Sequence, residues 1–399
     1  MSAAESSSTG TVKKTPLYDV HQDLGANLVD FAGYYMPLRY ASETAEHKAV
    51  RSGAGLFDLS HMGEIFLSGP QAGDALDHAL VGNLSPMKVG KARYTMICAH
   101  DGGVLDDLIV YRLADEVWMV VANAANVRVV REALIERAAG FEAVVDDRSD
   151  AYALIALQGP DAQGILTGFT DAPLADLKYY AILAGSVTRG GTTPHTPRGE
   201  EAASPVGAER VAGIDVLIAR TGYTGEDGFE LFADAGDAVA IWQELAKVEG
   251  VVPCGLASRD SLRLEAGMPL YGNELTAETS PFEAGLGRVV KLDKPGDFVG
   301  KAALAAQAQT PPGRRLVGLV AQGRRAPRKG YEVVTSDGTP CGVVTSGAPS
   351  PTLGKPIAMA YVDSAVLDTE PAAGLAVDVR GRREPVDVVD LPFYKRQAS

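Results

Sequence analysis

The chain has 399 residues, of which 46% are hydrophobic and 22% are charged, a balance typical of globular proteins. This length exceeds what one hydrophobic core usually serves, so we expect two or three domains. Its 37 Lys and Arg residues against 51 Asp and Glu residues give a formal net charge of −14, which disfavours a nucleic-acid partner because it repels a phosphate backbone. No apolar run approaches the ~18 residues of a membrane-spanning helix, and we expect a cytoplasmic protein with no membrane partner.

The three cysteines, Cys98, Cys254 and Cys341, are widely spaced and include no CxxC pair. This pattern predicts neither a disulfide framework nor a zinc site, and it fits a reducing compartment. The six histidines include no HxH or HExxH spacing. We therefore predict no metal. No GxGxxG segment indicates a bound flavin or NAD.

The first half of the chain predicts an α+β module. Residues 1–14, rich in Ser, Thr and Ala, are typical of a disordered tail. A helix is expected to begin after the N-cap Ser42 and to stop at Gly53. Phe57–Leu67 is expected to form one strand, and Gln71–Leu80 a short helix.

An antiparallel meander is expected next, from Tyr94–Cys98 through Val104–Arg112 to Val117–Val121. A helix from about Asn126 to Ala139 follows it. The order of strand, helix, paired strands and helix favours an antiparallel sheet over a doubly wound fold.

The second half begins with a strand at Ala153–Leu157 and a short helix. The Gly/Pro/Ser/Thr-rich stretch Thr188–Gly207 is predicted to be a surface loop. Further strands and helices are expected at Val216–Arg220, Gly228–Phe232, Asp237–Glu249 and Leu256–Ala266. From about Pro311, short strands with frequent turns indicate a small barrel or sandwich.

Two acids lie inside an aliphatic strand in the segment GGVLDDLIVY (Gly102–Tyr111). Because side chains alternate on a strand, Asp106 and Asp107 are expected to face opposite ways. A carboxylate held among aliphatic neighbours tends to have a raised pKa, which suits positioning an amine or exchanging a proton with it. The pattern fits equally well two Asp residues that satisfy turn amides after Gly102 and Gly103.

The segment RTGYTGEDGFE (Arg220–Glu230) combines three glycines with three acids. The glycines allow a tight loop that a ligand approaches closely, but the segment lacks the GxxxxGK of a phosphate-binding loop. Glu226, Asp227 and Glu230 fit a flat ligand with paired N–H donors, such as the 2-amino-4-oxo edge of a pterin. A hairpin with solvent-facing acids is the alternative interpretation.

A third segment, SRDSLRLEAG, puts Arg259 and Arg263 on one helix face. Such a pair can grip a ligand carboxylate, or it can form an ion-pair network with Asp260 and Glu265. In FDLSHM, adjacent Ser60 and His61 on a strand would face opposite sides and cannot pair as nucleophile and base, so we predict a structural role.

Taken together, the chain closely resembles the T protein of the glycine cleavage system, the aminomethyltransferase family. No single motif is specific, but the set spans nearly the whole chain in the family's order. The matching stretches are TPLYDVH (Thr15–His21), FAGYYMPLRY (Phe31–Tyr40), GLFDLSHM (Gly55–Met62), GGVLDDLIVYR (Gly102–Arg112), ALQGP (Ala156–Pro160), RTGYTGEDGFEL (Arg220–Leu231), RDSLRLEAGMPLYGNEL (Arg259–Leu275), VTSGAPSPTLGKPIAMAYV (Val344–Val362) and LPFYKR (Leu391–Arg396).

The resemblance implies a three-domain cloverleaf aminomethyltransferase fold of the α+β class, with antiparallel sheets and a C-terminal β-barrel or jelly-roll domain around a central folate cavity. We expect a discontinuous first domain (15–55 plus 145–280), a second α+β domain (56–144) and a barrel domain (281–399). The Thr188–Gly207 loop is longer than the family leads us to expect.

The resemblance also implies a reaction, in which an aminomethyl group on the lipoylated H protein passes to tetrahydrofolate. The products are 5,10-methylenetetrahydrofolate, ammonia and dihydrolipoyl H protein. Asp107 would be the catalytic carboxylate beside N5 and N10 of folate, with Asp106 its structural neighbour.

Further residues of this sequence match family positions that bind the folate. Glu230 corresponds to the acid that holds the pterin, and Arg259 to an arginine that contacts the ligand. Tyr394 corresponds to a C-terminal aromatic contact, while Tyr94 and Asn123 match positions that line the cavity.

Two other functions compete with this one. A folate-dependent demethylase-like module would share the fold, but such modules are fused to amine oxidases and this chain has no GxGxxG flavin domain. A non-catalytic folate-binding scaffold protein would be favoured by loss of Asp107 or of the RDSLRLEAG segment, and both are present.

Overall fold

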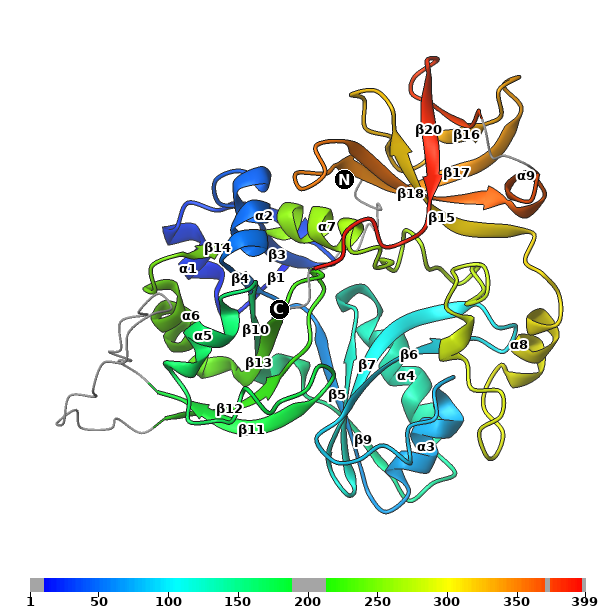
Figure 1. The fold of residues 1–399 in the computed structure, drawn as a ribbon. Helices are drawn as coiled ribbons and strands as arrows, with labels where there is room; N and C mark the ends of the chain where they lie inside the picture. The colour runs from blue at the N-terminus through cyan, green and yellow to red at the C-terminus, as the bar shows by residue number, and fades with distance from the viewer. Residues whose placement is uncertain (1–10, 189–212, 370–373, 397–399) are drawn as a thin grey trace. The chain divides into compact units, whose positions relative to one another are not determined.

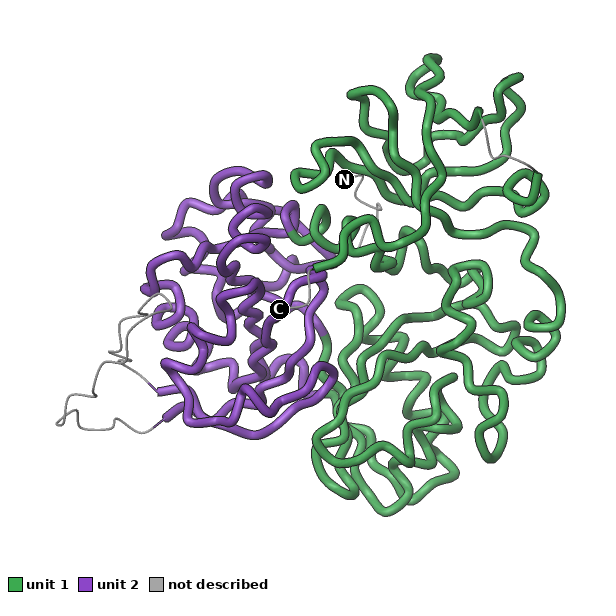
Figure 2. The backbone as a smooth tube through the Cα atoms, in the orientation of Figure 1, with its two compact units in different colours: residues 1–7, 63–147, 259–399 green, residues 8–62, 148–258 purple. Residues whose placement is uncertain are grey.

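The computed structural model describes residues 11–188, 213–369 and 374–396. Its described residues fall into two compact units (Figure 2). Within the described ranges, unit 1 comprises residues 63–147, 259–369 and 374–396, and unit 2 comprises residues 11–62, 148–188 and 213–258. Among the described residues no helix is both long and apolar enough to cross a membrane. The expected loop Thr188–Gly207 lies, apart from Thr188 itself, outside the described residues.

Unit 2 is built on a six-stranded sheet in the order β11-β12-β13-β10-β4-β14 (Figure 1). Aliphatic residues of its strands pack with helices α5 and α6 and bury Trp242 in one core. A smaller sheet, β1-β3-β2, and helices α1 and α2 complete the unit. The elements are β1 (Lys13–Lys14), α1 (Tyr18–Asp23), β2 (Asn27–Phe31), β3 (Tyr34–Arg39), α2 (Glu43–Ser52), β4 (Ala54–Asp58), η2 (Ser149–Ala151), β10 (Tyr152–Gln158), α5 (Ala162–Thr167), β11 (Ile182–Val187), β12 (Ile214–Ala219), β13 (Gly228–Asp234), η3 (Ala235–Asp237), α6 (Ala238–Ala246) and β14 (Val251–Pro253).

Unit 1 contains a five-stranded antiparallel sheet, β6-β7-β8-β5-β9, and a closed six-stranded barrel, β15-β18-β17-β16-β19-β20. Helices α3 and α4 share one hydrophobic core with the sheet. Helix α7 (Leu256–Glu265) crosses the boundary between the two units in sequence. The elements of unit 1 are β5 (Gly63–Ser68), α3 (Ala72–Ala79), β6 (Ala92–Cys98), β7 (Val104–Ala114), β8 (Val117–Ala122), η1 (Ala124–Asn126), α4 (Val127–Ala138), β9 (Val144–Asp147), η4 (Gly287–Val289), α8 (Lys301–Ala308), β15 (Arg314–Ala321), β16 (Glu332–Val334), β17 (Pro340–Pro349), β18 (Pro356–Asp363), α9 (Ser364–Leu367), β19 (Ala376–Asp378) and β20 (Arg383–Val389).

The structure confirms the expected meander and the C-terminal barrel. Strands β6, β7 and β8 pair antiparallel in sequence order, and the strands after Pro311 close into the barrel. The helix α2 starts where its cap predicts, since the Ser42 hydroxyl accepts the backbone N–H of Ala45. The division into three domains stays a prediction, because unit 1 holds both the meander sheet and the barrel.

The single strand expected at Phe57–Leu67 is wrong. The segment forms β4 and β5, which belong to different sheets, with a turn closed by the Met62 N–H donating to the Leu59 carbonyl. The cause is Asp58, whose buried carboxylate accepts the backbone N–H of Ser60 at 2.8 Å. This local hydrogen bond turns the chain and ends the strand.

Two element ends also differ from expectation. Lys13 and Lys14 belong to strand β1 rather than to a tail, because β1 pairs with β3 and the Lys13 ammonium binds Asp150. Residues 1–10 of the expected tail lie outside the described residues. The helix expected at Asp237–Glu249 ends at Ala246, three residues short.

A buried polar cluster ties the N-terminal segment of unit 2 to β4. The Asp58 carboxylate accepts the Thr15 hydroxyl at 2.7 Å and lies 2.9 Å from His21 Nε2. The other ring nitrogen of His21 contacts the Tyr40 hydroxyl at 2.8 Å. Burial raises the pKa of Asp58, but the hydrogen bond and charge of His21, together with the hydrogen bonds from Ser60 and Thr15, outweigh it and hold this pKa below its ordinary value.

We expect Asp58→Ala to lower the free energy of unfolding by about 3 kcal/mol, because it leaves Thr15 and His21 buried without their hydrogen-bond acceptor. The wild-type contribution should be complete above the carboxyl pKa of the unfolded chain, about 3.9, and should vanish as the pH falls through the lower folded value. Urea unfolding at pH 7 and pH 3 measures the loss of unfolding free energy and its dependence on pH. Asp150→Ala, which removes an exposed ion pair, is the control and should leave the urea midpoint in place; an equal loss in both variants would contradict the assignment.

Candidate functional site

The two acids of strand β7 lie on opposite faces of the five-stranded sheet, as strand alternation predicts. Asp106 lies opposite Ile97 and Asp107 opposite Met96 in the pairing with β6. Asp106 is fully buried, on the same face as the core residue Leu108, whereas Asp107 is only partly buried. Asp107 therefore faces out of that core.

Asn123, which directly follows β8, contacts both acids. Its backbone N–H donates to Asp106 Oδ2 at 3.0 Å, and its side-chain amide donates to Asp106 Oδ1 at 2.9 Å and to Asp107 Oδ1 at 3.0 Å. The Tyr94 hydroxyl donates to the other Asp107 oxygen at 3.1 Å. A third amide, Asn126 Nδ2, donates to Asp106 at 2.7 Å. The structure thus brings together Asp107, Tyr94 and Asn123, three of the residues that the sequence singled out.

Burial raises the pKa of both acids. The pKa of Asp107 rises to about 6, because loss of water outweighs the stabilising hydrogen bonds from Tyr94 and Asn123. The pKa of Asp106 rises to about 7, through burial and then through the charge of Asp107, against the bonds from the two asparagines. Both groups therefore titrate near neutral pH, where an acid can exchange protons at low cost.

Two residues of the segment YGNEL add to the electrostatics of this site. Burial, followed by the charge of Asp106, raises the pKa of Tyr271 to about 12. Glu274 is fully buried and its charge contributes to raising the pKa of Asp107. The Glu274 carboxylate accepts the Arg263 guanidinium at 2.8 Å and the Leu270 N–H at 2.9 Å.

Helix α7 separates the roles of its two arginines. Arg263 is buried and donates to Asp260 at 2.9 Å, to Glu274 and to the Ser346 hydroxyl at 2.7 Å. It belongs to an ion-pair network with Asp260 and Glu274, which fits the second of the two alternatives that the sequence left open. Arg259 is partly exposed.

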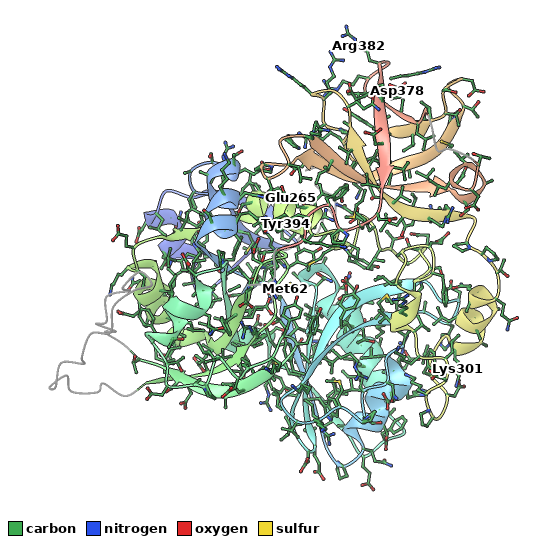
Figure 3. The ribbon with its side chains drawn as sticks, viewed as in Figure 1. Met62, Glu265, Lys301, Asp378, Arg382 and Tyr394 are labelled. Atoms are coloured by element: carbon green, nitrogen blue, oxygen red, sulfur yellow. The ribbon has the colours of Figure 1, made fainter. Side chains whose placement is uncertain are left out.

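The end of α7 holds the C-terminal segment of unit 1. The Tyr394 N–H donates to the Glu265 carbonyl at 2.8 Å, and the two residues lie side by side in Figure 3. The buried Glu265 carboxylate accepts the hydroxyls of Ser350 at 2.5 Å and Thr352 at 2.7 Å. Tyr394, partly exposed, is therefore fixed by its backbone to a helix end that is itself anchored to the barrel.

The acid-rich loop of unit 2 uses two of its three acids in ion pairs. Glu226 contacts Arg51 of α2 at 2.9 Å, and Asp227 pairs with Arg220 through two hydrogen bonds. Ion pairing of these two acids is a third arrangement, beside the ligand-binding loop and the hairpin with solvent-facing acids that the sequence allowed.

Glu230 differs from the other acids of the loop because it lies inside β13. It pairs with Ala156 of β10 and Ala219 of β12, in the middle of the six-stranded sheet. Its neighbours Phe229 and Leu231 belong to the hydrophobic core, so alternation directs Glu230 to the other sheet face. There its carboxylate is mostly buried and accepts the Thr221 hydroxyl.

Two glycines of this loop are required by close contact with Gln158. The Gln158 amide donates to the Thr221 carbonyl at 3.1 Å, and the Thr224 hydroxyl donates to the amide oxygen at 2.9 Å. A Cβ on Gly222 or Gly228 would overlap the Gln158 side chain. The glycines thus let the loop fold onto β10, which is a different use from the ligand approach that the sequence suggested.

Ser60 and His61 have structural surroundings, as expected, but the reason differs. They lie in the turn after β4 rather than on a strand. The Ser60 hydroxyl accepts the Leu154 N–H at 3.1 Å, and the His61 ring packs edge-on against Phe31.

Sequence reasoning missed Asn126 and Glu274. Asn126 carried a signal, because polar residues just after a buried strand face the strand ends of the sheet, here the end of β8. Glu274 carried none, since its link to Asp107 depends on the folding of a segment 167 residues further along the chain. No group of three His, Cys, Asp or Glu side chains within the described ranges is arranged to hold a metal ion; the absence of a metal stays a prediction.

Two protein-family models match successive parts of the chain. The model of the GCVT N-terminal domain matches residues 17–191 and 205–294. The model of the glycine cleavage T-protein C-terminal barrel domain matches residues 314–395, which contain the six barrel strands.

Curated relatives match along the whole chain. An aminomethyltransferase of Streptomyces avermitilis is 58% identical over 396 residues, covering 98% of this chain and 100% of the relative. One of Saccharopolyspora erythraea is 58% identical over 389 residues, covering 97% and 99%. The crystal structure of glycine cleavage system aminomethyltransferase T from Bartonella henselae superposes with a TM-score of 0.83 at 36% identity, covering 96% of this chain and 98% of that one. By sequence and by fold, the chain belongs to the glycine cleavage T-protein family of aminomethyltransferases.

Proposed function

We propose that this chain is the tetrahydrofolate-dependent aminomethyltransferase of a glycine cleavage system and that Asp107 is its catalytic carboxylate. The assignment of Asp107 rests on its partial exposure and on its hydrogen-bond donors. A partly exposed acid at a raised pKa is held by two neutral donors, Tyr94 and Asn123. Its neighbour Asp106 is fully buried and cannot meet a substrate without the sheet opening.

The reaction balances without an oxidant or reductant. N5 of tetrahydrofolate attacks the methylene carbon of the aminomethyl group, and N10 then closes the ring. Two C–N bonds form to the folate, while the C–N bond to ammonia and the C–S bond to the lipoyl sulfur break. The two protons lost from N5 and N10 go to the leaving amine and the leaving thiolate.

In this scheme the protein orients the reactants and controls protons. Asp107 holds the N5/N10 region and exchanges a proton with it, which suits a carboxyl group whose pKa lies near 6. Fixing the folate beside the carbon also excludes water from a reactive iminium-like centre.

Five further residues are proposed to bind the folate. Glu230 accepts the paired N–H donors of the pterin edge, for which a mostly buried carboxylate is a strong acceptor. Arg259 contacts the ligand, Tyr394 supplies an aromatic contact, and Tyr94 and Asn123 line the cavity beside Asp107.

The aminomethyl donor is proposed to be the lipoylated H protein of the same system, and the location the cytoplasm. The three cysteines, Cys98, Cys254 and Cys341, are free and buried, which fits a reducing compartment. The direct test is formation of methylenetetrahydrofolate from aminomethylated H protein, with and without tetrahydrofolate. Ammonia release at full rate without the folate would contradict the proposal.

Asp107→Asn should reduce aminomethyl transfer by at least about 100-fold, the size of a lost proton-transfer group, while tetrahydrofolate binding largely survives. Steady-state turnover with lipoylated H protein and calorimetric folate titration separate the two effects. Asp115→Asn, which alters an acid that is 93% exposed in the β7–β8 turn, is the matched control. Wild-type turnover by Asp107→Asn would remove Asp107 from the mechanism.

The pH dependence follows from the raised pKa of Asp107. If the ionised form is active, turnover rises with pH to a plateau, with a midpoint near 6. Tyr94→Phe removes a donor that stabilises the carboxylate, so the pKa of Asp107 rises and the midpoint moves to higher pH. A rate profile of both proteins from pH 5 to 9 tests this, and a midpoint that stays fixed in Tyr94→Phe would exclude Asp107 as the titrating group.

Glu230→Gln should weaken tetrahydrofolate binding by about 10- to 100-fold, because a charge-assisted hydrogen bond contributes on the order of 1.5 to 3 kcal/mol. The turnover number at saturating folate should change much less, since Glu230 is proposed to bind and not to react. Calorimetry and the KM for the folate measure the two quantities. A loss confined to the turnover number would assign Glu230 another role.

A further inference from the structure

Asp106 has an unusual set of partners for a buried acid. It is fully buried, and its hydrogen-bond donors are the backbone N–H of Asn123 and the side-chain amides of Asn123 and Asn126. All three donors are neutral. A carboxylate kept out of water without a cationic partner costs folding free energy, and this cost suggests a role other than stabilising the fold.

The geometry indicates that Asp106 acts on the side chain of Asn123. Both oxygens of Asp106 hold Asn123, Oδ2 through the backbone N–H and Oδ1 through the side-chain amide. This grip leaves the other hydrogen of the amide nitrogen for Asp107, whose Oδ1 lies 3.0 Å away and whose carbonyl oxygen lies 3.2 Å away. Rotation of the amide by half a turn would present an oxygen to both acids.

We propose that Asp106 is a positioning residue, which fixes the side-chain amide of Asn123 so that this amide donates to Asp107. The inference rests on the proposed function, in which Asp107 acts on the folate. Asn126 serves the same end at one remove, because it binds the Asp106 oxygen that also holds the Asn123 side chain. Asn126, Asp106 and Asn123 thus form a chain of hydrogen bonds at the end of β8, which links Asp106 on one face of β7 to Asp107 on the other.

Other groups also act on the two acids and must be kept constant in a test. Asp107 receives the Tyr94 hydroxyl and the charge of Glu274. Tyr271 responds to the charge of both Asp106 and Asp107. The Asp106→Asn variant below leaves Tyr94, Tyr271 and Glu274 unchanged.

The decisive variant is Asp106→Asn, because two hypotheses about Asp106 predict different changes in the pKa of Asp107. If Asp106 orients Asn123, its loss weakens the hydrogen bond to Asp107, and the pKa of Asp107 rises. If Asp106 acts only as a neighbouring charge, its loss removes a repulsion, and the pKa of Asp107 falls or stays in place. A purely structural role lowers stability and leaves that pKa unchanged.

The pKa of Asp107 is measured directly by NMR on full-length protein labelled with ¹³C at the aspartate carboxyls. The Asp107 signal is assigned by its disappearance in Asp107→Asn. We expect the midpoint to rise by about half a pH unit or more in Asp106→Asn, as it does when one hydrogen bond to a carboxylate is lost. Tyr94→Phe, which removes a direct donor, gives the reference shift, and Asp115→Asn should give none. A lowered or unchanged midpoint in Asp106→Asn overturns the proposal.

A second measurement uses the wild-type protein and stands if Asp106→Asn does not fold. The two side-chain N–H signals of Asn123 should titrate differently, one following Asp106 and the other Asp107, since each hydrogen faces a different carboxylate. Two signals that both follow Asp107 alone would overturn the proposal.

Failure of this inference can be told apart from failure of the proposed function. Full turnover by Asp107→Asn defeats the function, whatever the NMR midpoints are. Loss of turnover in Asp107→Asn, with an Asp107 midpoint that does not rise in Asp106→Asn, keeps the function and defeats the inference. If both hold, the acidic limb of the turnover number moves to higher pH in Asp106→Asn, while the KM for the folate stays within about twofold.

Discussion

An ionised group that leaves water must find hydrogen bonds or an opposite charge, and this constraint arranges the polar interior of both units. In unit 2 it joins Asp58 to His21 and Glu226 to Arg51. In unit 1 it joins Arg263 to Glu274. These pairs fix segments that are far apart in sequence, and through them the positions of the strands that carry the proposed site residues.

Asp106 meets the same constraint with neutral amides instead of a cation. Amides satisfy the oxygens without neutralising the charge, so the pKa stays high. A lysine or arginine in their place would lower the pKa of Asp106. Asp107 also has neutral donors, Tyr94 and Asn123, and burial raises its pKa to about 6.

The proposed site residues have supports of different kinds. Asp107 and Glu230 sit inside paired strands, and a strand within a sheet holds its side chains more firmly than a loop does. Tyr394 lies in an irregular C-terminal segment, and its backbone depends on the Glu265 carbonyl at the end of α7. A substitution at Glu265 that disturbs Ser350 and Thr352 would reach Tyr394 through this helix end.

Much of the local structure follows from the sequence because its causes are local. Ser42 caps its helix, and period-two alternation sets Asp106 and Asp107 on opposite faces of β7. The strand expected across Phe57–Leu67 failed for the opposite reason. Its break depends on Asp58 folding back onto Ser60 while it binds Thr15 and His21, and these partners cannot be read from a run of apolar residues.

The sequence by itself determined the family motifs, the meander, a C-terminal barrel or sandwich, and the opposite orientation of the two acids of β7. Only the tertiary structure decided which partners each acid has. Asn123 reaches both carboxylates because the pairing of Val121 with Ile109 places the residue after β8 beside the two acids of β7. Arg263 is engaged in the interior by Glu274 and Ser346. A side chain's partners depend on which distant segments pack against it, and strand periodicity carries no information about that choice.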